Sequence, residues 1–401
     1  QTARLPEVVR RSAGRMGIVR AGVTLLFMMT LAIGPADVVG APPTGDELTA
    51  YLDSLVAEMG IPGITVGVAW PDGSVTGLAA GVADTVTAAR LGPDSRMLQG
   101  SVGKTYFGAV ALQLVAEGRI RLDDRLSRYL GDEPWYPRLP NGAEVTIRQL
   151  MSHTSGIVRY EFNPAFLEDL RAEPMRTFSP TERLDYLFGF DPPFAAGEGW
   201  EYSDTNFILL AMVIEDVTGA AAYDEIQRRL LDSLGLSETI RSDAPSVYGL
   251  VNGYAGSQNP FGVFDATMEH GRLVFNPQFE WGGGGFASTA GDLAEWTRHV
   301  HEGRAFDETL LDEMHQGTPA PLGPEASYGL GVIMMQLSHG TAWGHSGFMP
   351  GYRTEAYYFP DHGFAIAVQI NTTDNSVLTR SPLRILDELA GRIITDLEER
   401  S

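Results

Sequence analysis

A serine and a lysine three residues apart, Ser101 and Lys104, form the most distinctive pair in this sequence. Lysine can lose its proton when its surroundings favour the neutral amine, whereas arginine stays charged in proteins. The chain has 29 basic residues, and Lys104 is its only lysine. Because residues i and i+3 share one face of a helix, the Lys104 amine can reach the Ser101 hydroxyl and accept its proton. The pair predicts a serine nucleophile that forms a covalent acyl-enzyme.

Two later segments carry side chains that suit acyl-transfer chemistry. Tyr202 is followed by a serine and by Asp204, and His345 is followed by Ser346 and a glycine. A tyrosine or histidine on its own is more often structural than functional. From the residues alone, neither side chain is therefore assigned a function.

These three segments resemble, in order and spacing, the motifs of the serine β-lactamase and DD-peptidase superfamily. That superfamily groups class C β-lactamases, D-alanyl-D-alanine carboxypeptidases and related esterases. Residues 146–156, 201–207 and 284–293 also look like it, and the resemblance runs from about residue 45 to the C-terminus. It implies an acyl-enzyme hydrolase without metal or cofactor, acting on a peptidoglycan-like peptide, an ester or a β-lactam.

The resemblance implies a role for each catalytic candidate. Ser101 would attack the substrate carbonyl, and Lys104 would tune Ser101 and share its proton. Tyr202, whose counterpart in the family can act as a phenolate, would pass a proton to the leaving group and help to activate water. His345 stands where many relatives have lysine and would supply either positive charge or a hydrogen bond.

The resemblance also implies a substrate-binding set made of Asp204, Ser346, Gly347 and Phe348. The backbone N–H groups of Ser101 and Phe348 would form an oxyanion hole, in which each donor is typically worth about 3 kcal/mol. Gly347 would let substrate lie along a strand. Asp204 departs from the family, which usually has asparagine there, and an ionised carboxylate can only accept hydrogen bonds.

A second departure concerns the recognition of carboxylate. Between residues 331 and 379 the only arginine is Arg353, so the arginine that precedes the third motif in relatives has no clear match. Both departures weigh against β-lactam and D-Ala-D-Ala specificity. The first interpretation is nevertheless a D-alanyl-D-alanine carboxypeptidase-like enzyme or a D-amino-acid peptidase. The alternatives are a β-lactamase-related carboxylesterase and a penicillin-sensor-like binding module that does not turn over.

Other candidate sites carry weaker signals. A serine-histidine-aspartate hydrolase would need a Gly-x-Ser-x-Gly pentapeptide, which is absent. Ser155, close to His153, is interpreted as part of a structural turn at a helix end. His299 and His301 lack a nearby third ligand, so no metal site is predicted.

The elements that must position these side chains follow from periodicity. Helical spacing covers residues 44–58, 106–117, 147–151, 180–188, 206–218, 223–234, 292–301 and 383–397. Strand-like patterns cover 64–70, 74–78, 328–336, 353–359 and 364–371, with a turn at 361–363. Strand-rich ends therefore bracket a helical middle.

We predict an α/β fold in which an antiparallel sheet flanked by helices is built from both chain ends, with an inserted all-helical domain, as in β-lactamases and transpeptidases. The α/β domain would comprise residues 44–104 and 287–401. The helical domain would comprise residues 105–286. Residues 1–41 would form a signal-peptide region.

Composition limits the partners and suggests a location. A formal charge of −22 disfavours nucleic acid and anionic lipid, and the chain has no cysteine. Four arginines between residues 10 and 20 precede an apolar run at 23–33 and then small residues, which is typical of a secretory signal. We therefore expect a secreted or periplasmic protein without a stable membrane span once mature. An uncleaved N-terminal anchor is the alternative.

Overall fold

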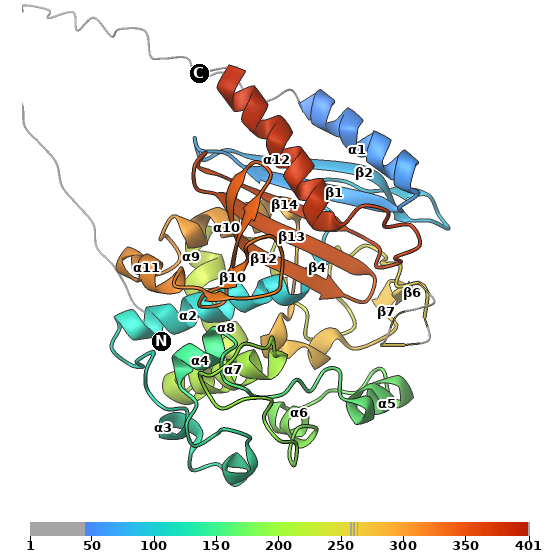
Figure 1. The fold of residues 1–401 in the computed structure, drawn as a ribbon. Coiled ribbons are helices and arrows are strands. Elements are labelled where there is room, and N and C mark those ends of the chain that lie inside the picture. The colour runs from blue at the N-terminus through green and yellow to red at the C-terminus, as the bar shows by residue number, and fades with distance from the viewer. Residues whose placement is uncertain (1–44, 257–258, 260, 263, 400–401) are drawn as a thin grey trace, which may run out of the picture. The chain divides into compact units, whose positions relative to one another are not determined.

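A nine-stranded antiparallel sheet dominates the computed structural model, which describes residues 45–256, 259, 261–262 and 264–399 (Figure 1). The predicted signal-peptide region, residues 1–41, lies outside the described residues. The strand order is β3-β2-β1-β14-β13-β12-β11-β10-β9. The strands are β1 (Gly63–Ala69), β2 (Val75–Asp84), β3 (Ala89–Arg90), β9 (Thr318–Pro319), β10 (Ser327–Tyr328), β11 (Ile333–Leu337), β12 (Gly340–Met349), β13 (Tyr352–Phe359) and β14 (Phe364–Ile370).

The two ends of the chain meet at the centre of this sheet. β1 pairs with β14, with Ile64 opposite Ile370, and both strands are buried along their whole length. Their near-continuous apolar sequence is typical of strands covered on both faces. The prediction of one antiparallel sheet built from both chain ends is therefore confirmed.

Helices cover both faces of the sheet. Larger side chains such as Ile366 and Val368 of β14 pack with α1 (Gly45–Met59) and α12 (Pro382–Glu399), whereas Ala365 and Ala367 face the opposite way. This alternation follows from the two-residue period of a strand. On the opposite face α10 (Ala290–His301) packs against β1, β13 and β14.

Short helices fill the middle of the chain (Figure 1). They are α2 (Lys104–Ala116), α3 (Ser127–Leu130), α4 (Ile147–Met151), α5 (Pro164–Ala172), α6 (Pro180–Asp185), α7 (Asp204–Thr218), α8 (Ala222–Ile226), α9 (Asp232–Leu234) and α11 (Leu311–Met314). Two small sheets accompany them, β4 (Met97–Leu98) with β8 (Phe286–Ser288) and β5 (Ile240–Arg241), and β6 (Met268–Glu269) with β7 (Arg272–Leu273). The domain boundaries at residues 104 and 287 stay a prediction.

Two sequence-based expectations differ from the structure. The predicted single strand over residues 328–336 is divided between β10 and β11. Gly331, with φ +85°, lies between them, and its N–H bonds to the Met151 carbonyl in the helical segment. Strand β12 and helix α5 were not predicted.

Among the described helices, none by itself has the length and apolar character needed to cross a membrane. The stretches Asp204–Thr218 and Ala222–Leu234 reach that standard only as a pair, and the pair is bent by 77°.

Candidate active site

Close backbone contact between a short helix and a strand creates the site. Ser101 lies in the 3-10 helix η1 (Gly100–Gly103), which leads directly into α2. A Cβ at Gly100, where φ is +55°, would lie 2.6 Å from the Phe348 nitrogen. A Cβ at Gly347 would lie 1.9 Å from the Gln99 carbonyl oxygen. Glycine at both positions therefore lets η1 and β12 approach, and brings the backbones of Ser101 and Phe348 into adjacent segments as an oxyanion hole requires.

Lys104 is fully buried behind the nucleophile. Its Nζ donates to Ser101 Oγ at 2.9 Å and to the Gly283 carbonyl oxygen, and it lies 2.6 Å from Asp204 Oδ1. Two oxygens accept hydrogen bonds from this amine and the Asp204 carboxylate pairs with it as an ion, surroundings that suit an ammonium group. The resting lysine is thus arranged as a cation that orients the Ser101 hydroxyl.

The Gly-rich segment before β8 supplies the carbonyl that binds Lys104. A Cβ at Gly284 would lie 2.1 Å from Glu280 Oε1 and 2.5 Å from the Gly100 carbonyl oxygen. Glu280 Oε2 accepts the Gly285 N–H at 2.9 Å. Side chains would not fit in this segment, and their absence lets its backbone reach both η1 and Glu280.

Tyr202 lies beside the same lysine. The Lys104 ammonium is 5.0 Å from the centre of its ring, and the Tyr202 hydroxyl is buried without a hydrogen bond of ordinary geometry within the described residues. Burial and the Asp204 charge raise the pKa of Tyr202 well above its usual range, although the nearby Ser101 hydroxyl opposes this. The raised pKa favours the neutral phenol in the resting side chain, and the proton-transfer role of Tyr202 stays a prediction.

His345 is buried in β12 with both ring nitrogens occupied. Nδ1 lies 2.6 Å from the Ser346 carbonyl oxygen, which can only accept, so Nδ1 carries the proton. Nε2 then accepts from the Tyr328 hydroxyl at 3.0 Å. Burial and the Lys104 charge lower the pKa of His345 to about 3. Of the two predicted roles, the structure supports the hydrogen bond and opposes the positive charge.

Ser346 is held by an acidic neighbour on the adjacent strand. Its Oγ donates to Glu355 Oε2 at 2.5 Å and lies 3.0 Å from the Tyr357 hydroxyl. Glu355 is buried, and burial raises its pKa to about 7. This end of the site therefore combines a hydroxyl with a carboxyl group.

All eight predicted site residues come together, although their roles stay predictions. Seven of them, all but the buried Lys104, line one cavity of about 440 Å³. The full lining is Ser101, Arg159, Glu161, Phe162, Tyr202, Asp204, Phe261, Phe279, Glu280, Leu322, Ile333, His345, Ser346, Gly347, Phe348, Met349, Pro350, Arg353 and Glu355.

Sequence analysis missed three carboxyl groups of this cavity. Glu161 accepts from Arg159 at 2.5 Å through Oε1, while its Oε2 is buried without a hydrogen-bond partner within the described residues. Burial and the Asp204 charge raise the pKa of Glu161 to about 7, and burial raises that of Glu280 to about 8. With Glu355 they belong to no motif, and the sequence offers no signal that would bring them together.

The other histidine and serine candidates do not line the cavity, although the His153 ring centre lies 4.2 Å from that of Tyr202. The turn after α4 holds His153 and Ser155, which bond to Asn206 rather than to the cavity. His301 bonds to His315. No group of three or more possible metal ligands occurs within the part of the chain that the structure describes.

Comparison with known proteins agrees with this geometry. The protein-family model described as Beta-lactamase matches residues 48–389. The chain therefore belongs to the Beta-lactamase family.

Individual relatives are distant. The chain is 24% identical to Penicillin-binding protein 4* of Bacillus subtilis (strain 168), over 75% of this chain and 66% of the relative. It is 25% identical to a D-aminopeptidase of Brucella anthropi, over 73% of this chain and 52% of the relative. The chain thus spans about half to two thirds of the length of these curated relatives.

Two solved structures resemble the fold over most of the chain. A D-stereospecific amidohydrolase from Streptomyces sp. has a TM-score of 0.71 and 30% identity, covering 84% of this chain and 98% of the other. A D-amino acid amidase from Ochrobactrum anthropi SV3 has a TM-score of 0.74 and 22% identity, covering 89% and 99%. The second likeness shows the fold alone.

Proposed function

We propose that this chain hydrolyses the amide bond of small D-amino-acid amides or D-peptides whose acyl part carries a free amino group. The names of the distant relatives, a D-aminopeptidase and a D-stereospecific amidohydrolase, support this substrate class. The acidic lining of the cavity is the observation that carries the proposal.

The charge pattern favours a cationic substrate group. Asp204, Glu161, Glu280 and Glu355 line the cavity, and the unpartnered Glu161 Oε2 is an acceptor that an ammonium can satisfy. A buried acceptor left without a donor typically costs about 1–3 kcal/mol. An entering ammonium would relieve that cost and the repulsion between Glu161 and Asp204, whereas an N-acylated substrate would bring no charge.

The proposed mechanism uses residues that contact Ser101 or the cavity. Lys104 first gives one proton to the Asp204 carboxylate 2.6 Å away, and the neutral amine then accepts the Ser101 proton as Oγ attacks the substrate carbonyl. The carbonyl oxygen accepts hydrogen bonds from the N–H groups of Ser101 and Phe348. The C–N bond then breaks, and the leaving amine takes a proton from Lys104 or through the Tyr202 hydroxyl. Water hydrolyses the ester on Ser101 and restores the enzyme.

One observation favours a second candidate, a D-alanyl-D-alanine carboxypeptidase. Arg353 lines the cavity, and its Nε is buried without a hydrogen-bond partner within the described residues. A guanidinium group is suited to bind the terminal carboxylate of such a peptide. The carboxyl group of Glu355, two residues along the same strand, opposes this because it would repel a second carboxylate.

A matched panel separates these candidates. Release of ammonia from D-alanine amide, L-alanine amide and N-acetyl-D-alanine amide is compared with hydrolysis of an N-acyl-D-Ala-D-Ala peptide, a p-nitrophenyl ester and a chromogenic cephalosporin. We expect kcat/KM for D-alanine amide to exceed that for its N-acetyl form by about tenfold or more, the effect of one charge-assisted contact. Faster turnover of the D-Ala-D-Ala peptide would favour the carboxypeptidase, and acylation without turnover would favour the sensor-like module.

A variant tests the proposed anchor. Glu161→Gln should lower kcat/KM for D-alanine amide more than for N-acetyl-D-alanine amide, while Glu47→Gln, on the exposed side of α1, should change neither. An equal loss on both amides would show that Glu161 only supports the fold.

We also propose that the protein is exported, on the basis of the basic and apolar pattern in residues 10–41. Expression of the full chain, followed by fractionation and N-terminal sequencing, tests this. Protein found only in the cytoplasmic fraction with these residues intact would contradict it.

A further inference from the structure

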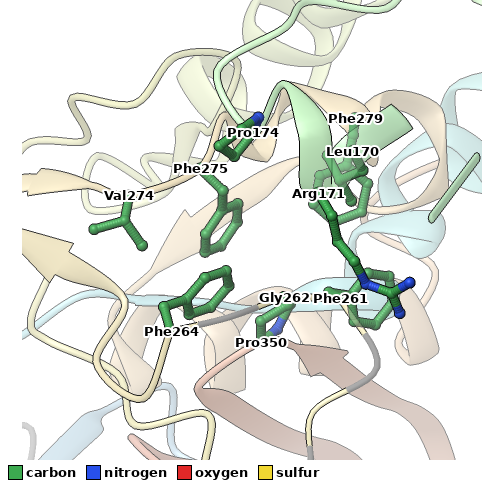
Figure 2. Close-up of a pocket in the computed structure, with 10 residues that line it drawn as sticks. All are labelled: Leu170, Arg171, Pro174, Phe261, Gly262, Phe264, Val274, Phe275, Phe279 and Pro350. Carbon is green, nitrogen blue, oxygen red and sulfur yellow. The ribbon is translucent and has the colours of Figure 1, made fainter. Parts of the chain in front are cut away.

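A second, apolar cavity adjoins the catalytic cavity. It has a volume of about 130 Å³ and lies between α5, residues 261, 262 and 264, the residues after β7 and the turn after β12 (Figure 2). Its lining is Leu170, Arg171, Pro174, Phe261, Gly262, Phe264, Val274, Phe275, Phe279 and Pro350. We call it the aromatic pocket.

Two pairs of stacked rings form its opposite walls. The rings of Phe264 and Phe275 have centroids 5.3 Å apart and an interplanar angle of 13°. Those of Phe261 and Phe279 are 5.8 Å apart at 26°. Figure 2 shows the first pair on one side of the space and the second pair on the other, with Leu170 beside Phe279. The pocket is therefore bounded largely by aromatic faces and edges.

Its size and chemistry select one kind of occupant. A dry apolar cavity of about 150 Å³ lined by leucine, isoleucine and phenylalanine is a known binding site for benzene. The aromatic pocket is close to that volume. Ring faces and edges suit an aromatic guest through offset or edge-to-face contacts, whereas a polar guest would lose its hydrogen bonds to water.

The pocket shares a wall with the catalytic cavity. Phe261, Phe279 and Pro350 line both cavities. The Phe261 ring is also 6.0 Å from that of Phe348, whose backbone belongs to the predicted oxyanion hole. A ring held in the pocket therefore lies next to the cavity that contains Ser101.

We infer that the aromatic pocket is a specificity subsite that takes an aromatic ring of the substrate. This inference rests on the proposed function for the identity of the rest of the substrate, a D-amino-acid amide. It predicts a preference for amides in which a phenyl ring extends from the acyl part over those with a methyl group alone.

Binding without catalysis gives the first test. The probe is 3-phenyl-1-propanol, the reference is 1-propanol, and titration calorimetry on the Ser101→Ala protein gives both affinities. We expect the phenyl compound to bind at least about tenfold more tightly, as burial of an aromatic group requires. Equal affinity for the two alcohols would overturn the inference.

Filling the pocket gives the second test. Val274→Phe and, from a different element, Leu170→Phe should each reduce binding of 3-phenyl-1-propanol by tenfold or more. Val86→Phe adds the same ring at an exposed site and should leave binding unchanged. Thermal unfolding shows which filled variants are folded, and folded variants that keep full affinity would overturn the inference.

Kinetics connect the pocket to the substrate. The ratio of kcat/KM for D-phenylalanine or D-homophenylalanine amide to that for D-alanine amide should be well above one in the wild type, and should fall about tenfold in the filled variants. If none of these amides is hydrolysed while the alcohol still binds, the proposed function fails and the pocket stands. If the amides are hydrolysed without any preference for a ring, the pocket assignment fails and the proposed function stands.

Discussion

The surroundings of Ser101 and Ser155 differ sharply, although both serines are linked to α7, Ser155 through Asn206 and Ser101 through Lys104 and Asp204. Ser155 Oγ donates to Asn206 Oδ1 at 2.6 Å and accepts the Ile157 N–H at 3.0 Å, so its hydroxyl is fully engaged and buried. Ser101 is only half-buried, lines the cavity and receives a hydrogen bond from a buried ammonium.

The difference lies in charge and in unfilled hydrogen-bonding capacity. The Ser155 hydroxyl lies in a neutral region, because burial lowers the pKa of its neighbour His153 well below the usual range. His153 Nε2 has no hydrogen-bond partner within the described residues, but the Ser155 hydroxyl has two. The Ser101 region gathers charged groups around polar atoms without partners. A buried polar site that is satisfied stabilises the fold, whereas one that awaits a ligand can bind and react. Five experiments test this comparison.

The largest effect is expected at the nucleophile. A fluorophosphonate should label the protein once, at Ser101, and Ser101→Ala should lose on the order of 10⁴ or more in kcat/KM, as nucleophile variants do. Peptide mapping locates the label. A label on Ser155 or Ser346 would reverse the assignment.

The next effect concerns Lys104. Lys104→Arg keeps a cation but cannot accept the serine proton, so kcat/KM should fall by at least about 10². Assays at several pH values distinguish a loss of catalysis from a shift in the pH at which kcat/KM is highest. Thermal unfolding shows whether the variant is folded. Activity above a tenth of the wild type would mean that Lys104 acts only as a positive charge.

Asp204 contacts Lys104 and also lines the cavity, so it can affect both catalysis and substrate binding. Asp204→Asn replaces an acceptor by a group that also donates, and should favour N-acylated peptides and cephalosporins over simple esters. We expect the ratio of their kcat/KM values to rise by about fivefold or more, the equivalent of one hydrogen bond. A loss of both activities in equal proportion would identify Asp204 as a partner of Lys104 alone.

Much of the catalytic side of this comparison could be predicted from sequence. Ser101 and Lys104 are three residues apart, so local helical geometry alone brings them together. Strand β12 could not be found, because Gly340, Gly344 and Gly347 interrupt its apolar alternation. Close packing requires the last two: a Cβ at Gly344 would lie 1.9 Å from the Ala356 carbonyl oxygen, and one at Gly347 would lie 1.9 Å from that of Gln99.

The carboxyl groups of the cavity were unpredictable for a different reason. Glu280 lies 119 residues after Glu161 and 75 residues before Glu355, so the three meet only through tertiary packing. The aromatic pocket was missed in the same way, because its lining comes from four separate segments, two of which supply the rings. Sequence patterns indicate which residues are neighbours within one helix or strand. These two sites are formed by contacts between different elements.

The pH dependence of stability should separate the charged region from the neutral one. Glu280 has an ordinary pKa of 4.5 when unfolded and about 8 in the fold. Between these values the folded state binds more protons, so the free energy of unfolding falls as pH rises. Glu280→Gln should remove this contribution. The free energy of unfolding of the variant minus that of the wild type should therefore rise between pH 5 and pH 8, by a few kcal/mol at most. Urea unfolding across this range provides the measurement, and a constant difference would contradict a raised pKa.

The smallest effect on activity is expected at Ser155. Ser155→Ala leaves the Asn206 carbonyl oxygen and the Ile157 N–H without their partner, which should lower the free energy of unfolding by about 1–3 kcal/mol. Ser233→Ala, at an exposed site, should change it by about 0.5 kcal/mol or less.

Activity provides the decisive reading for Ser155. The Ser155 hydroxyl does not line the cavity, so its loss should not affect the chemical steps. At temperatures below the melting transition, kcat/KM should therefore stay within about twofold of wild type. Denaturant unfolding and initial rates on one preparation give both quantities. If Ser155→Ala kept full stability and lost more than tenfold in kcat/KM, the hydroxyl would belong to the catalytic machinery. The contrast between a satisfied serine and a reactive one would then be wrong.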